Sequence, residues 1–199
     1  MVRDMTNPIR ILAFAGSLRR DSWNKKLAHV VAEGARSAGA EVTVLDLRDY
    51  ARPLYDGDVE AASGLPDAAK RFKQALIAHH GLLIASPEYN SSISGVLKNA
   101  IDWASRAEPG EKPLICFEGK VAGLVSASPG ALGGLRGLVT VRSILGNLRV
   151  LVVPEQVAVS KAHEAFDAEG RLSDAKVADS VRNVAKRVVT VARALYPEV

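Results

Sequence analysis

The chain has 199 residues, of which 48% are hydrophobic and 24% are charged. These ordinary values exclude a chain that stays disordered for want of apolar surface. Lysine and arginine outnumber aspartate and glutamate by 26 to 22, a formal net charge of +4. This excess suits an anionic ligand but is too small and too dispersed to indicate a nucleic-acid partner. We expect one domain over residues 1–199, because the length falls in the usual range for a single domain.

The lone cysteine, Cys116, excludes an internal disulfide and any cysteine-cluster metal site. Residues 1–7 lack the layout of a signal peptide, and no apolar run approaches the ~20 residues needed to cross a bilayer. We therefore expect a cytoplasmic protein with no membrane partner. The histidines have no neighbouring ligands at metal spacing, and acidic residues 56–60 are typical of a solvated loop, so we expect no metal site.

Short apolar runs alternate with longer stretches of helical periodicity along the whole chain. Strands are predicted at residues 9–15, 41–46, 81–86, 120–127 and 149–153. Helices are predicted from about residue 24 to 38, through Phe72 and Leu76, over 95–106, up to about 148, and from 177 to 195. Residues 47–66 are expected to form a loop, and Pro154 is expected to end the fifth strand.

Strands that alternate with helices predict a parallel sheet covered by helices on both faces. The strand at 81–86 agrees, because it is almost purely apolar and an absence of alternation indicates burial on both sides. We therefore predict an α/β, doubly wound domain with five strands. In such a domain the ligand binds in the crevice at the carboxyl ends of the strands.

The first turn at this crevice reads Gly-Ser-Leu-Arg-Arg-Asp-Ser-Trp-Asn over residues 16–24. A phosphate is one interpretation, because a helix N-terminus favours an anion and arginine adds charge-assisted hydrogen bonds. The alternative is structural, because serine and asparagine commonly cap helices. Neither Gly-x-Gly-x-x-Gly nor Gly-Lys-Ser/Thr occurs here, which disfavours a pyrophosphate and favours a single terminal phosphate.

The second and third turns also have unusual compositions. Residues 86–95 read Ser-Pro-Glu-Tyr-Asn-Ser-Ser-Ile-Ser-Gly. Their backbone polar groups could bind the edge of a planar heterocycle, with Tyr89 supplying an apolar face, or they could form an ordinary loop capped by Ser94. Residues 126–136 are rich in glycine, which suits close approach of the backbone to a ligand but is not specific by itself.

Taken together, these motifs resemble the NADPH-dependent FMN reductases over about residues 9–154. The motifs are Gly-Ser-Leu-Arg-x-x-Ser-x-Asn, Ser-Pro-Glu-Tyr-Asn, Lys-Asn-Ala-Ile-Asp-Trp at 98–103 and Ser-x-Gly-x-x-Gly-Gly-x-Arg at 128–136. This flavodoxin-like family includes bacterial quinone and chromate reductases. The resemblance implies a five-stranded sheet of order 2-1-3-4-5 that holds FMN non-covalently. It also implies hydride transfer from NADPH or NADH to FMN, and onward transfer to a quinone or similar small molecule.

The resemblance also implies, by motif position, which residues hold FMN. The phosphate would be held by Ser17, Arg19, Ser22 and Asn24, with Trp23 beside them as a packing residue of the same turn. The isoalloxazine edge would be lined by Pro87, Glu88, Tyr89 and Asn90, and its other side by Ser128 and Gly130. No side chain is expected to act as an acid or base, because the flavin carries the chemistry.

The family is typically dimeric or tetrameric, which implies a homodimer or homotetramer with the helix that contains Asn99 and Trp103 at the dimer face. Ser91 and Ser94 depart from the aromatic residue and the proline of many relatives, which affects contacts on the substrate side. Besides a flavin-free regulatory or scaffold protein with the same sheet, two other functions stay open. One is a reductase that supplies free reduced FMN to a partner monooxygenase. The other is a non-enzymatic, flavodoxin-type electron carrier, although such carriers are usually acidic.

Overall fold

The computed structural model describes residues 8–197. Its main sheet has parallel strands in the order β2-β1-β3-β6-β7. Their bounds are β1 (Arg10–Ala15), β2 (Glu41–Leu45), β3 (Gly81–Ala85), β6 (Val121–Ala127) and β7 (Leu151–Val159). Counted along the chain, this order is 2-1-3-4-5, so the predicted flavodoxin-like, doubly wound α/β class is confirmed. Residues 1–7, where the sequence predicts no signal peptide, lie outside the described part.

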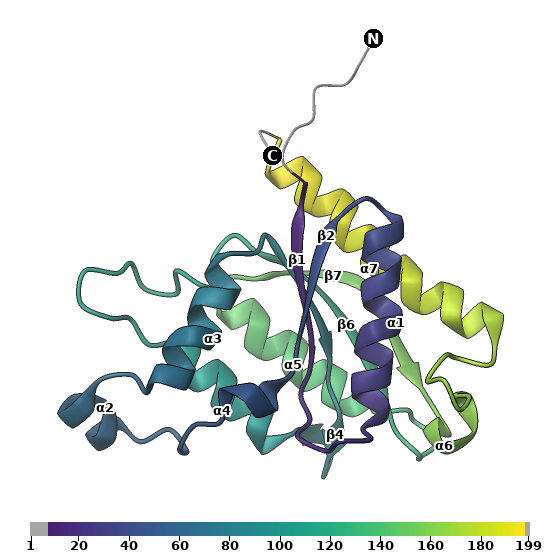
Figure 1. Cartoon of the computed structure of the whole chain (residues 1–199), viewed down its shortest axis with the longest axis horizontal. Helices are drawn as coiled ribbons and strands as arrows, with labels where there is room; N and C mark the ends of the chain where they lie inside the picture. Colours follow the sequence, from purple (N-terminus) through teal and green to yellow (C-terminus); the bar gives the residue numbers. More distant parts are fainter. Residues whose placement is uncertain (1–7, 198–199) are drawn as a thin grey trace.

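Helices cover both faces of the sheet (Figure 1). One face carries α1 (Trp23–Ser37) and α7 (Ala175–Leu195), and the other carries α3 (Asp67–Ile77), α4 (Gly95–Ala104) and α5 (Leu135–Asn147). Every residue of β3 and β6 is buried, as strands between two helical layers require. Within residues 8–197, no helix combines the length and the apolar composition needed to cross a bilayer.

Several short elements were not predicted. They are a 3-10 helix, η1 (Leu47–Tyr50), the helices α2 (Gly57–Ser63) and α6 (Ala162–Ala165), and a hairpin of β4 (Glu88–Tyr89) and β5 (Ser92–Ile93). None of the residues of α2 is buried, so its sequence carries no apolar period from which a helix could be predicted. The hairpin lies within the second turn and therefore contributes directly to the site.

The prediction that Pro154 ends the fifth strand is wrong. β7 continues to Val159, and its pairing with β6 shifts register between Ala122 and Leu124, opposite the proline. Proline lacks an N–H donor, which is tolerated on an edge strand or at an irregularity of the ladder. β7 is at the edge of the sheet, so the strand passes through Pro154.

The helix α4 uses two of its polar side chains to hold the loop that follows η1. Asn99 Nδ2 and Trp103 Nε1 both donate to the carbonyl oxygen of Pro53, each at 2.9 Å. Trp103 is completely buried. These two side chains of the helix that the resemblance places at a dimer face contact the chain's own loop.

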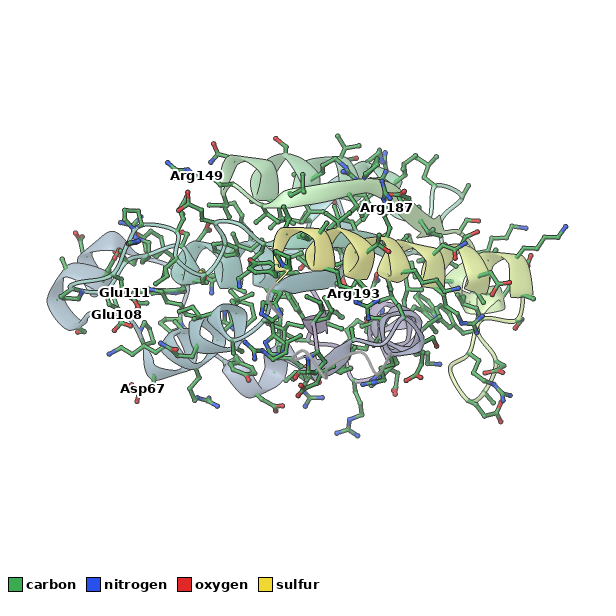
Figure 2. All side chains as sticks on the ribbon, turned by 90° about the horizontal axis from the view of Figure 1, so that it is seen from above. Asp67, Glu108, Glu111, Arg149, Arg187 and Arg193 are labelled. Atoms are coloured by element: carbon green, nitrogen blue, oxygen red, sulfur yellow. The ribbon has the colours of Figure 1, made fainter. Side chains whose placement is uncertain are left out.

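The loop between α4 and β6 is held against α3 by ion pairs. Glu108 and Glu111 lie together at the end of the molecule away from α7 (Figure 2). Lys70 contacts Glu108 at 3.3 Å, and the buried Lys73 is paired with Glu111. The turns that form the site lie at another edge, at the carboxyl ends of the strands. That edge, with β4, lies away from the start of β1 and the end of α7 (Figure 1).

Candidate functional site

A cleft lies at the carboxyl ends of β1, β3 and β6, where the three predicted turns meet. It is an open cleft with a cavity volume of about 210 Å³. It is lined by Arg19, Ser22, Trp23, Asn24, Pro87, Glu88, Tyr89, Ala127, Ser128 and Pro129. The structure therefore brings most of the predicted residues together, but Ser17, Asn90 and Gly130 are not in the lining. Ala127 and Pro129 were not predicted, although both belong to the third turn.

The first turn directs the N-terminus of α1 into the cleft. Ser22 stands at the N-cap, yet its side chain makes no capping hydrogen bond, so the N–H groups of the first helical turn keep no side-chain acceptor. The Arg19 guanidinium lies 5.6 Å from the centroid of the Trp23 ring, a cation–π contact that restrains it. Ser17 is buried, and its Oγ accepts from the Arg19 N–H at 3.3 Å. This end of the cleft is suited to an anion.

Asn24 has a role that its motif did not indicate. Its side chain is buried, Nδ2 donates to the Ala127 carbonyl at 2.8 Å, and Oδ1 accepts from the Ala127 N–H at 3.0 Å. The two bonds hold the start of α1 against the end of β6. The side-chain amide thus has a structural role, and the backbone N–H of Asn24 belongs to the first turn of α1.

The second turn is the β4–β5 hairpin, which is attached to the first turn. Asn90 and Ser91 at its tip have φ of 50° and 64°, the left-handed values that tight hairpin turns use. Asn90 is exposed there, beyond the lining. Ser94 caps α4 as predicted, accepting from the Leu97 N–H at 3.2 Å, and its hydroxyl donates to the Gly16 carbonyl at 2.6 Å.

Glu88 and Tyr89 differ in how their side chains are used. Tyr89 is 51% exposed. The Glu88 carboxylate is largely buried and bound to Arg136 and to the Gly137 N–H. Burial raises the pKa of Glu88, but the hydrogen bonds from Gly137 and Arg136 outweigh it and hold this pKa below its ordinary value. The carboxylate is therefore ionised and neutralised by Arg136, and the positive charge of Arg19 remains in the cleft.

The third turn brings backbone close to the cleft. Ser128 Oγ accepts from the Gly130 N–H at 3.3 Å, and Gly130 itself is exposed. Gly134 has φ of 93°, and a β-carbon there would lie 1.8 Å from Ser126 Oγ. Only glycine fits this position without a shift of the backbone.

These groups fit a ligand that has a phosphate at one end and a planar ring at the other. The helix N-terminus and Arg19 suit the phosphate. Pro87 and Tyr89 give the ring apolar surface beside exposed main chain. Among residues 8–197, no group of three His, Cys, Asp or Glu side chains could hold a metal ion. Fold and cleft thus define a doubly wound α/β protein with a site for a phosphorylated, ring-containing cofactor at the carboxyl edge of its sheet.

Comparisons with known proteins identify the family. The family described as NADPH-dependent FMN reductase matches residues 9–164. An NAD(P)H-dependent FMN reductase of Pseudomonas aeruginosa is 43% identical over 180 residues, covering 89% of this chain and 92% of its own. A 2-hydroxy-1,4-benzoquinone reductase of a Burkholderia species is 37% identical over 82% of this chain and 85% of its own. The solved flavoenzyme NAD(P)H:(acceptor) oxidoreductase FerB of Paracoccus denitrificans superposes with a TM-score of 0.78 at 27% identity, covering 94% and 98% of the two chains.

The chain therefore belongs to the NADPH-dependent FMN reductase family. The predictions of an oxidoreductase, of FMN as its cofactor and of NAD(P)H as its hydride donor are confirmed. Because the chain is an enzyme of this type, the alternative of a non-enzymatic electron carrier is set aside.

Proposed function

We propose that the chain binds FMN in the cleft at the carboxyl ends of β1, β3 and β6 and passes electrons from NAD(P)H to a quinone. The observation that carries this proposal is the N-terminus of α1, which has no side-chain cap and faces the cleft beside Arg19. The helix dipole, free N–H groups and a guanidinium together favour a phosphate there. The benzoquinone reductase and the quinone reductases among the relatives support a quinone as the acceptor.

In this proposal the first turn holds the phosphate and the other two turns hold the ring. Arg19 and the N–H groups at the start of α1 bind the phosphate. The Ser17 hydroxyl accepts from the Arg19 N–H and keeps its own hydrogen to donate to the phosphate, whereas Asn24 mainly ties the start of α1 to β6. The full set of binding residues is Ser17, Arg19, Ser22, Trp23, Asn24, Pro87, Glu88, Tyr89, Asn90, Ser128 and Gly130.

Bound FMN would supply the hydride chemistry, and the chain would supply binding, orientation and electrostatics. The first turn anchors the phosphate and thereby sets how deep the ring sits between the walls. Main-chain N–H groups of the second turn would stabilise negative charge at the ring edge. No side chain is assigned as an acid or base, and the carboxylate of Glu88 is already neutralised by Arg136.

A homodimer or homotetramer is the assembly that we propose, with the chain acting as one domain over residues 1–199. Leu132, Leu135 and Val139 are 51%, 42% and 62% exposed at the start of α5, and a second copy would cover them. Leu135 and Val139 share one face because they are four residues apart on a helix. Sedimentation equilibrium should give at least a dimer, and Val139→Lys should shift the distribution toward monomer. A monomeric wild type would refute this assembly.

We also place the chain in the cytoplasm, where NAD(P)H is regenerated. Fractionation of cells that express the tagged chain tests this location. Recovery of the chain outside the cytoplasmic fraction would contradict it.

The visible absorption spectrum of the purified chain tests the proposal for FMN. A flavin spectrum should be present, or should appear with added FMN, then bleach with NADPH and return with a quinone. Chromate, tried in parallel, tests a metal oxyanion as the acceptor. Flavin that is lost on gel filtration, with turnover of free FMN, would instead indicate a reductase that supplies a monooxygenase. A chain that neither binds FMN nor oxidises NADPH in its presence would refute the proposal.

Arg19→Ala tests the phosphate end. The loss of a charge-assisted hydrogen bond should weaken FMN binding by about 1.5–3 kcal/mol. Arg20→Ala is the matched control, because Arg20 is the next residue, is exposed and does not line the cleft. Equal FMN affinity in the Arg19 variant and the wild type would exclude Arg19 from the phosphate site.

A further inference from the structure

The helix α5 has no capping side chain of its own. Gly134 is at its N-cap, and a β-carbon there would lie 1.8 Å from Ser126 Oγ, so no residue with a capping side chain fits. The N–H groups in the first turn of a helix have no partner inside the helix. α5 therefore needs an acceptor from another part of the fold.

Glu88 supplies that acceptor from β4. Its Oε2 accepts from the Gly137 N–H at 3.1 Å, and its Oε1 accepts from Arg136 Nε at 2.8 Å and Nη2 at 2.6 Å. The side chain is only 8% exposed. Both oxygens have donors, and the negative charge faces the positive end of the helix dipole. The carboxylate thus caps α5 from a different loop.

The same residue begins the hairpin that forms one wall of the cleft. The hairpin rests so closely on α5 that a β-carbon on Gly137 would lie 3.3 Å from Glu88 Cβ and from the Ser92 carbonyl oxygen. At its other end the hairpin is tied to the first turn by the bond from Ser94 to Gly16. The second turn is therefore attached to both the first and the third turn. Its attachment to the third turn is the ion pair between Glu88 and Arg136.

We infer that Glu88 is a positioning residue: by capping α5 it joins the second and third turns, so that the cleft is formed before FMN enters. The inference rests on the proposed function, because it assigns what the attachment does for FMN. A site that is already ordered binds more tightly, since less ordering accompanies binding. The carboxylate of Glu88 acts through Arg136 and Gly137 and needs no contact with the ring.

Glu88→Gln tests this role because it keeps the shape of the side chain and removes its charge. The two carboxylate oxygens of Glu88 accept from Arg136 and from the Gly137 N–H, but an amide has only one acceptor oxygen. In the variant its NH2 group must therefore face one of these two donors. The FMN dissociation constant, measured by quenching of flavin fluorescence, should rise about tenfold. Without FMN, the amide hydrogens of residues 88–93 and 128–137 should exchange faster than in the wild type.

Arg136→Gln should weaken FMN binding in the same direction but less, because the Gly137 N–H still binds the carboxylate. In the double variant the effect should be smaller than the product of the two single effects, since both variants break one attachment. A purely additive result would show that Glu88 and Arg136 act separately, and would overturn the inference.

Asp174→Asn is the matched control. Asp174 caps α7 and accepts from the Lys176 N–H at 2.8 Å, which is the same chemistry on a helix that does not line the cleft. This variant should keep the wild-type FMN affinity and the wild-type exchange rates at 88–93.

Wild-type FMN affinity in Glu88→Gln would also overturn the inference, and so would an equal loss of affinity in Asp174→Asn. A wild-type chain that binds no FMN would refute the proposed function instead. In that case the amide exchange rates still test whether Glu88 joins the second and third turns. Unchanged exchange in Glu88→Gln would show that it does not.

Discussion

Replacing Lys120 by methionine should stabilise the protein, although the residue is buried and hydrogen-bonded. Lys120 lies just before β6, is 5% exposed and donates from Nζ to the His79 carbonyl. Within residues 8–197, no carboxylate lies close enough to pair with it. Burial lowers the pKa of Lys120 from its ordinary value of 10.5 to about 8, with a smaller contribution from Arg10 in the same direction. At neutral pH the fold therefore carries a buried ammonium without a counter-ion.

The pKa gives the size of the effect. A fall from 10.5 to about 8 costs the folded state about 3 kcal/mol at neutral pH. Methionine removes that cost but leaves the His79 carbonyl without its donor, a loss of about 1–2 kcal/mol. The free energy of unfolding should therefore rise by about 1–2 kcal/mol at pH 7.

The pH dependence gives a sharper test. Between pH 8 and 10.5 the unfolded chain keeps the Lys120 proton and the folded chain has lost it, so wild-type stability should rise with pH. Burial also raises the pKa of the neighbouring Cys116 to about 12, which lowers stability above about pH 9 as the unfolded thiol ionises. The informative window is therefore pH 8–9, where Lys120→Met should lack the rise seen in the wild type. His79 and His80 have lowered pKa values and are neutral in this window.

Urea unfolding at pH 7, 8 and 9 measures both quantities. Lys73→Met is the control, because Lys73 is equally buried but is paired with Glu111. Removing one partner of a buried pair costs about 3–5 kcal/mol. If Lys120→Met destabilised the protein as Lys73→Met does and kept the wild-type slope between pH 8 and 9, the reasoning would be wrong.

Further predictions concern two contacts between distant segments. A β-carbon at Gly34 would lie 2.7 Å from Arg182 Cα, so Gly34→Ala should separate α1 from α7 and lower the free energy of unfolding by about 1–2 kcal/mol in urea. Unchanged stability would contradict the close approach. Asn24→Ala leaves both backbone groups of Ala127 unpaired and should cost about 2–4 kcal/mol. It should also weaken FMN binding in a fluorescence titration, and a normal FMN affinity would separate Asn24 from the site.

The fold could be predicted from the sequence because the apolar periodicity of a strand or a helix is visible in residues that are adjacent or a few positions apart. An apolar run such as 81–86 shows in adjacent residues that both sides of a strand are buried, and α7 repeats its valines every three or four residues. Elements without an apolar period could not be predicted in this way. The exposed helix α2 and the passage of β7 through Pro154 depend on where these segments lie at the edges of the fold.

The candidate site was predicted in its location but not in its internal bonding. Turns of unusual composition at the ends of three strands indicate where a ligand binds. The partners of Asn24 and Glu88 are 103 and 48 or more positions away along the chain, and no local pattern reveals such pairs. The burial of Lys73 and Lys120 could not be predicted either. Lysine is usually exposed, and its burial depends on partners that are distant in the sequence.

The pairing of the first helix with the last has a consequence during synthesis. α1 packs through Leu27 and Val31 on the same core as Val181 and Val184 of α7. The ribosome makes ~5–20 residues per second, so α7 begins to be made about 7–30 seconds after α1 is complete. Until then α1 covers this face of the sheet without α7, and the apolar residues that α7 buries are uncovered. The nascent chain therefore exposes apolar surface of the kind that chaperones bind, and we expect the same of a chain truncated before residue 175.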